Sequence, residues 1–127
     1  MNLSESCFVK LEALCQEVRE SHEKLNKAQS AVDRHISDIY HSVERAEDFT
    51  VEEGDAIARK LKEALHKRRL VKDELARLYP VYDIFRNGIG EVDANYRRSV
   101  RKSFNRELAM KANVNLGDIF EEYGIEY

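Results

Sequence analysis

The feature that most constrains this chain is a series of apolar residues spaced alternately by three and four, from Phe8 to Ala46. Ten of its twelve positions are apolar or cysteine, and no glycine or proline occurs from Ser4 to Glu53. A repeat of 3.5 residues is typical of a helix that packs along a coiled-coil seam. We therefore predict one helix over about residues 5–47. The seam positions are Phe8, Leu11, Cys15, Val18, His22, Leu25, Gln29, Val32, Ile36, Ile39, Val43 and Ala46.

A second long helix should follow a short break at Asp48. Thr50, with Glu53 three residues later, forms a capping box, which marks the start of a helix. Pro80 should stop this helix near Tyr79, because the residue before a proline disfavours helical geometry. Its seam runs through Ile57, Leu61, Ala64, Arg68, Val71, Leu75 and Leu78.

Charge predicts that the two helices pair with each other as an antiparallel hairpin. Residues 1–48 carry six basic and ten acidic side chains, whereas residues 57–78 carry eight basic and three acidic ones. Opposite charges beside the seam favour this pairing over self-association of either helix, and a short loop makes consecutive helices antiparallel. The polar seam positions Gln29 and Arg68 should then meet, in a layer that sets the register.

The two helices have unequal expected lengths. At about 1.5 Å per residue, the first is some 60 Å long and the second some 43 Å. Phe8, Leu11, Leu14, Cys15 and Val18 should therefore extend beyond the partner helix. Either the C-terminal third or a second copy of the chain is expected to cover them.

The C-terminal third is expected to add short helices. They span 80–86, ended by Asn87-Gly88; then Asp93 or Asn95 to about Ala112; and finally 116–123, ended by Gly124. The predicted fold is all-α: an antiparallel, coiled-coil-like hairpin over residues 1–79, with the short helices of 80–127 packed on its open end in the same compact unit. A hairpin buries little area for its length, so we also expect a homo-oligomer.

Composition narrows the class of protein. With 21 basic and 24 acidic side chains, the chain is neither a strongly basic nucleic-acid binder nor a highly acidic DNA mimic as a whole. No apolar run approaches the roughly 18 residues of a membrane span, and the N-terminus lacks a signal-peptide pattern. Cys7 and Cys15 on one helix would lie about 12 Å apart, beyond disulfide reach. We expect a reduced, cytoplasmic protein with no membrane partner.

The sequence does not indicate an enzyme. It has no glycine-rich phosphate loop, no cysteine pair at zinc spacing and no serine on a strand-to-helix elbow. We predict no catalytic residue, no cofactor and no metal; His22 in the seam should pack against Leu75 or Leu78. Two acid-x-x-His pairs are expected on the outward, solvated face: Asp38/His41 and Glu63/His66.

The most pronounced charge cluster spans residues 95–111, with six basic side chains and one acidic one. It suits binding to phosphates or to an acidic partner. Alternatively, its apolar stripe docks on the first helix, whose glutamates pair with the arginines. The stripe is Tyr96, Val100, Phe104 and Leu108, with Arg97 and Arg101 expected on one side of it and Arg98, Lys102 and Arg106 on the other.

A short segment, ELAMKANVNLGDI over residues 107–119, resembles the helix–turn–helix of phage-repressor-type DNA-binding domains. The resemblance implies a recognition helix that carries Asp118, Glu121 and Glu122, which would repel phosphates. The matching residues are Leu108, Ala109, Asn113, Val114 and Ile119.

The hairpin itself resembles another group of proteins. The runs Ile39–Glu44 and Lys60–Leu75 are similar to small helical-hairpin proteins of unknown function encoded by phages and prophages of Gram-positive bacteria. The resemblance implies a context, because small phage proteins often bind and disable a host or defence component. If phage-encoded, the protein would act in the host cytoplasm.

We therefore expect a non-catalytic binding protein, a phage-encoded inhibitor that contacts a host or anti-phage defence protein directly. One alternative is a nucleic-acid-binding regulator that uses the basic helix 95–111. Another is an oligomeric sequestrant that clamps a nucleotide signal between subunits with arginines and tyrosines.

Overall fold

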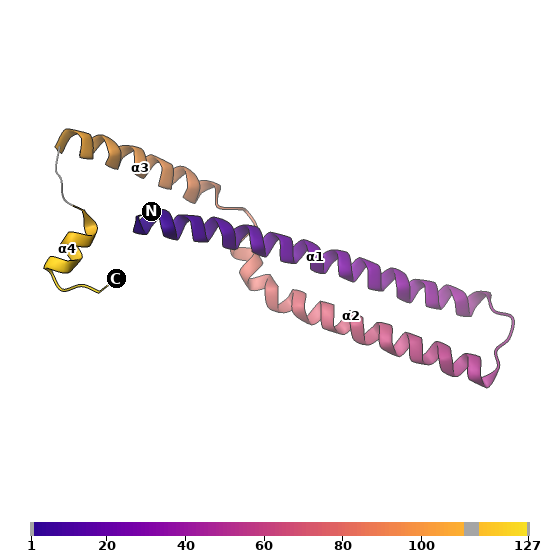
Figure 1. Cartoon of the computed structure of the whole chain (residues 1–127). Coiled ribbons are helices and arrows are strands. Elements are labelled where there is room, and N and C mark those ends of the chain that lie inside the picture. The colour runs from indigo at the N-terminus through magenta and orange to yellow at the C-terminus, as the bar shows by residue number, and fades with distance from the viewer. Residues whose placement is uncertain (1, 111–114, 127) are drawn as a thin grey trace. The chain divides into compact units, whose positions relative to one another are not determined.

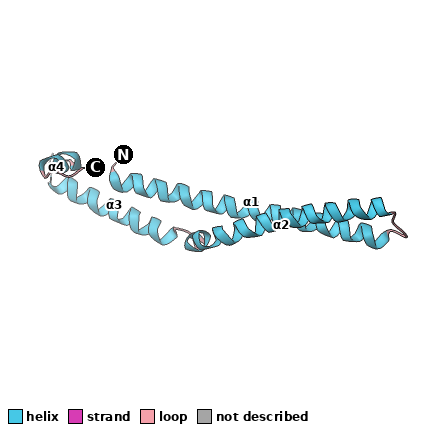
Figure 2. Cartoon of the chain, turned by 90° about the horizontal axis from the view of Figure 1, so that it is seen from below, coloured by secondary structure: helices cyan, strands magenta, loops and turns pink. Residues whose placement is uncertain are grey.

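The computed structural model describes residues 2–110 and 115–126, and this part of the chain is entirely helical apart from turns and loops (Figures 1 and 2). It divides into two units, Met1–Ile89 and Gly90–Tyr127. The predicted all-α class is confirmed. The four helices of the described residues are α1 (Leu3–Arg45), α2 (Val51–Phe85), α3 (Gly90–Met110) and α4 (Leu116–Glu122).

In the first unit, α1 and α2 pack along each other as the predicted antiparallel hairpin (Figure 1). Side chains cap the start of both helices. The backbone N–H of Glu5 donates to Asn2 Oδ1 at 2.8 Å, and that of Glu53 donates to Thr50 Oγ1 at 3.1 Å. The Thr50 start signal is therefore confirmed, since each such bond satisfies a backbone donor that the first helical turn leaves unpaired.

The predicted seams form the core of the hairpin, in two clusters of buried residues. The open-end cluster is Cys15, Val18 and Phe85, and the loop-end cluster is Ile36, Ile39 and Ala64. The remaining predicted seam residues of α1 and α2 are half-buried, except Ala46, which is exposed just beyond α1. The 3.5-residue pattern thus identified the buried face of both helices.

A polar layer lies between the two clusters. Arg68 Nε of α2 donates to Asp33 Oδ1 of α1 at 3.0 Å. We expected Arg68 opposite Gln29, whereas its ion pair is with Asp33, one turn further along α1 toward the loop.

The predicted helix end at Tyr79 is wrong, because α2 continues through Pro80 to Phe85. Proline removes one backbone hydrogen bond from a helix interior and costs about 3 kcal/mol. Burial opposes this cost: Phe85 is only 6% exposed and packs in the open-end cluster, where Tyr82 also packs. Each large apolar side chain buried in this way contributes about 1.5–3 kcal/mol. Residues 80–86 are therefore the end of α2 and not a separate helix.

This longer α2 also corrects the expected overhang of α1. Leu11, Cys15 and Val18 pack against residues at the end of α2 and need no other segment to cover them. Phe8 is half-buried, whereas Leu14 is exposed.

The turn after α2 confirms the stop signal at Asn87-Gly88. Gly88 has φ +75°, a left-handed conformation that favours glycine, and its N–H donates to the Phe85 carbonyl at 2.7 Å. Ile89 then packs against the open-end cluster.

In the second unit, α3 begins at Gly90, before the predicted Asp93 or Asn95. Its predicted end at Ala112 lies outside the described residues. α4 matches its prediction closely: the Asp118 N–H donates to Asn115 Oδ1 at 2.9 Å, and Gly124 ends it with φ +66°. Among the helices of residues 2–110 and 115–126, none has an apolar stretch long enough to cross a membrane.

Candidate functional site

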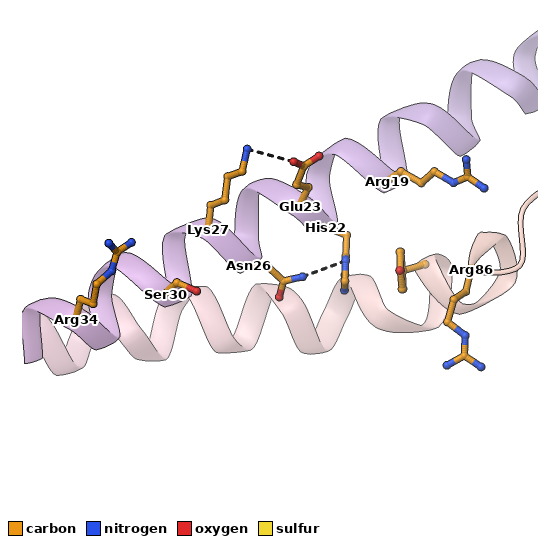
Figure 3. A pocket seen from close by; sticks show the side chains of 9 residues that line it. Arg19, His22, Glu23, Asn26, Lys27, Ser30, Arg34 and Arg86 are labelled. Atoms are coloured by element: carbon orange, nitrogen blue, oxygen red, sulfur yellow. Dashed lines mark hydrogen bonds and ion pairs between the residues drawn. The ribbon is translucent and has the colours of Figure 1, made fainter. Parts of the chain in front are cut away.

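An open groove of about 640 Å³ follows one side of the hairpin, along α1 and the last turns of α2 (Figure 3). We call it the basic groove. α1 supplies a row of polar side chains beside its seam, and α2 supplies Tyr82 and Arg86. The row on α1 is Arg19, Glu23, Asn26, Ser30 and Arg34, with His22 and Lys27 next to it.

The regular geometry of α1 explains why these side chains share one face. Their spacings of three and four residues place them in line along a helix. Arg19 and Arg34 are fifteen positions apart, so at 1.5 Å per residue the row is about 22 Å long. Figure 3 shows Arg19 and Arg86, from different helices, at one end of the groove and Arg34 at the other.

Two stacked rings form part of the groove wall. The imidazole of His22 and the phenol ring of Tyr82 have centroids 3.7 Å apart and planes 6° from parallel. The Asn26 amide nitrogen lies 3.2 Å from His22 Nδ1, within hydrogen-bond distance. We expected His22 to pack against Leu75 or Leu78, but the continuation of α2 through Pro80 brings Tyr82 to it instead.

The charges of the groove are predominantly positive. Four basic side chains and one carboxylate, that of Glu23, line it. Lys27 pairs with Glu23 at 3.1 Å, and Arg86 lies 3.7 Å from Asp83, which is outside the groove. Arg19 and Arg34 have no ion pair within the described part of the chain. α1 places three of its six basic residues in the groove but only one of its eight acidic residues. An otherwise acidic helix thus presents a positive surface here.

The predicted basic residues lie on α3, in the second unit. Arg97 Nε donates to Asp93 Oδ1 at 2.9 Å, and Arg98 Nη1 donates to Asn95 Oδ1 at 3.4 Å. Tyr96 is half-buried. Within the described residues, three exposed basic side chains of α3 make no hydrogen bond or ion pair: Arg101, Lys102 and Arg106.

The apolar stripe of α3 is largely exposed. Val100 is 47% exposed, Phe104 59% and Leu108 60%. At 100° per residue, Arg97 and Arg101 border this stripe as predicted. The expectation for the other side is wrong: Arg98, Lys102 and Arg106 do not border the stripe, because they lie about half a turn around the helix from it. α3 therefore has an apolar face and, opposite to it, a basic face formed by Arg98, Lys102 and Arg106.

The acid–histidine pairs lie on the surface, as expected. Asp38, His41, Glu63 and His66 are all exposed, and Glu63 pairs with Lys67 at 3.6 Å. Among residues 2–110 and 115–126, no three His, Cys, Asp or Glu side chains gather as metal ligands. Of the resembled helix–turn–helix, the turn residues Asn113 and Val114 lie outside the described residues.

Sequence reasoning missed the basic groove. The spacing of Arg19, Asn26 and Arg34, at steps of seven and eight residues, was a usable signal, because it marks a single polar face. The other wall depends on Tyr82 and Arg86, which reach α1 only because α2 continues past Pro80.

No protein-family model matches this chain, and neither a curated protein nor a solved structure matches it. Two surfaces of the chain are candidates for function: the exposed stripe of α3 and the basic groove of the hairpin.

Proposed function

We propose that this protein is a non-catalytic binding protein that docks on a partner protein through α3. The observation that supports this proposal is the exposed stripe of Val100, Phe104 and Leu108, each about half or more exposed. A helix in water normally buries such a stripe, and exposed apolar patches are typical of interaction sites. Side chains at four-residue steps are also the anchors with which a helix lies in an apolar groove of its partner.

The charges around the stripe define the chemistry of the partner. Arg97 and Arg101 border the stripe; Arg97 pairs with Asp93, whereas Arg101 makes no ion pair within the described residues. Complementary potentials steer association and select partners. The proposed partner surface is therefore an apolar groove bordered by carboxylates. Following the resemblance of the hairpin to phage proteins, we propose that it belongs to a host protein or an anti-phage defence component.

A homo-oligomer is part of the same proposal. Leu3 and Leu14 are exposed on α1 and lie eleven positions apart, which places them on one face of the helix. A second hairpin packed there would cover both side chains in a helix bundle. Light scattering on the full chain tests this: a mass of one chain contradicts it, and a Leu3→Ser/Leu14→Ser variant should shift an oligomer toward the monomer.

The main test is capture of a partner from a nuclease-treated bacterial lysate by the tagged full chain. A Phe104→Ser/Leu108→Ser variant should lose the captured protein, because both anchors become polar. The matched control is Leu70→Ser/Ile84→Ser, which removes two apolar residues of α2 that are 69% and 74% exposed. Circular dichroism checks that both variants keep their helicity.

Each outcome bears on the proposal. A protein retained by the native chain and by the control, but lost by the Phe104/Leu108 variant, supports docking through α3. Equal retention by both variants overturns it. A protein recovered only without nuclease would instead favour nucleic-acid binding, and its loss in an Arg98→Gln/Lys102→Gln variant would assign that binding to residues 95–111.

A further inference from the structure

We infer that the basic groove is a binding site for a single strand of nucleic acid. This site lies wholly within the hairpin and is independent of the docking surface on α3. The first observation is the distribution of charge: α1 carries more acidic than basic residues, yet half of its basic residues line the groove. The acidic remainder of α1 repels phosphates, so attraction of a polyanion is concentrated at the groove.

The second observation is the shape of the site. The groove is about 22 Å long between Arg19 and Arg34, which corresponds to about six nucleotides at 3.4 Å per nucleotide in a stacked strand. Proteins that bind single strands use site sizes of about 4–16 nucleotides per module.

The third observation is the kind of side chain at each position. Arg19, Arg34 and Arg86 are guanidinium groups, which bind phosphate oxygens through two parallel hydrogen bonds. Lys27 is paired with Glu23 inside the groove at 3.1 Å, so we count the three arginines as the phosphate contacts; of these, Arg86 also lies 3.7 Å from Asp83. The His22–Tyr82 stack adds an aromatic wall between the ends of the row, of the kind against which bases pack in single-strand sites.

The test measures fluorescence anisotropy of a labelled fifteen-residue oligothymidine with the full chain. Three phosphate contacts predict a salt slope of about −2, hence about a 20-fold loss of affinity between 50 and 200 mM salt. An Arg19→Gln/Arg34→Gln variant should bind at least about tenfold more weakly at 50 mM, and its loss over the same salt range should shrink to about threefold.

A matched control separates the groove from general charge. Lys10→Gln/Lys24→Gln also removes two positive charges from α1, but from exposed positions outside the groove, and should leave the affinity within about twofold. Equal weakening by both variants overturns the assignment. So does a native chain that does not bind the oligonucleotide at 50 mM salt, or an Arg98→Gln/Lys102→Gln variant on α3 that alone abolishes binding.

Competition identifies the form of the ligand. Unlabelled oligothymidine should displace the probe far better than the same nucleotide concentration supplied as thymidine monophosphate, because one strand contacts several cations. Equal displacement by the mononucleotide, or equal binding of a fifteen-base-pair duplex, would contradict a single-strand groove. The Phe104→Ser/Leu108→Ser variant should bind the oligonucleotide like the native chain. Failure of the groove proposal can therefore be distinguished from failure of the docking proposal for α3.

Discussion

The imidazole of His22 lies flat against the phenol ring of Tyr82, with their centroids 3.7 Å apart. The same phenol ring packs against the open-end cluster and lines the basic groove. One side chain of α2 therefore takes part both in the core of the hairpin and in the wall of the candidate site, so the stability of the open end and the shape of the groove are coupled.

Replacement of Tyr82 tests this coupling. Tyr82→Leu should lower the free energy of unfolding by about 1 kcal/mol more than Tyr82→Phe, because only the phenylalanine keeps an aromatic ring against His22. Urea unfolding followed by circular dichroism measures the difference. The leucine variant should also bind the oligonucleotide more weakly than the phenylalanine variant. Equal stability of the two variants would show that the stack contributes nothing.

Phe85 should contribute more to stability than its neighbour in sequence. Phe85→Ala leaves a cavity in the open-end cluster and should cost about 3–4 kcal/mol. Ile84→Ala is the matched control, because Ile84 is exposed and its loss should change the free energy of unfolding by less than about 0.5 kcal/mol. Similar values for the two variants would mean that the end of α2 does not pack on α1 in solution.

The two cysteines should differ in their reaction with a thiol reagent. Cys7 is exposed, whereas Cys15 is buried in the open-end cluster at 4% exposure. Because only an accessible thiolate reacts, the native chain should be modified rapidly at Cys7 and at Cys15 only after unfolding. Mass spectrometry of the modified chain identifies the site. A Cys7→Ser variant that still reacts rapidly under native conditions would contradict the burial of Cys15.

The ion pair between Arg68 and Asp33 should contribute modestly. Both side chains are partly exposed, so solvent screens their attraction. A double-mutant cycle of Arg68→Ala and Asp33→Ala should give a coupling energy of about 0.5 kcal/mol, measured by urea unfolding. The coupling should fall in 1 M salt, where the screening length is about 3 Å. A coupling that salt leaves unchanged would rule out an ionic origin.

The hairpin was predictable because its signals are local or periodic. The seam from Phe8 to Val43 repeats every 3.5 residues, and the cap at Thr50 needs only the three residues after it. The opposite net charges of residues 1–48 and 57–78 then favour pairing of these two helices with each other. The stops at Gly88 and Gly124 also depend on a single backbone conformation at each position.

The end of α2 and the groove were not predictable in the same way. The local preference at Pro80 favours a break, and the burial of Phe85 against Cys15 opposes it across a separation of seventy positions. A short stretch of sequence never contains both residues, so a local pattern does not reveal this contact. The groove depends on that outcome, since its second wall consists of Tyr82 and Arg86. Docking of the stripe that includes Phe104 depends on a partner surface and stays a prediction.

The two clusters of the hairpin lie at different places along one repeating seam, with the Arg68–Asp33 layer between them. A structure of this kind can be lengthened in whole repeats. Seven residues added to α1 between Arg34 and Ile36, and seven added to α2 between Ala64 and Arg68, would move the loop about 10.5 Å away from the groove, while the three buried residues of each cluster stay together. Insertion or deletion of paired heptads would therefore change the length of the hairpin without rebuilding either end.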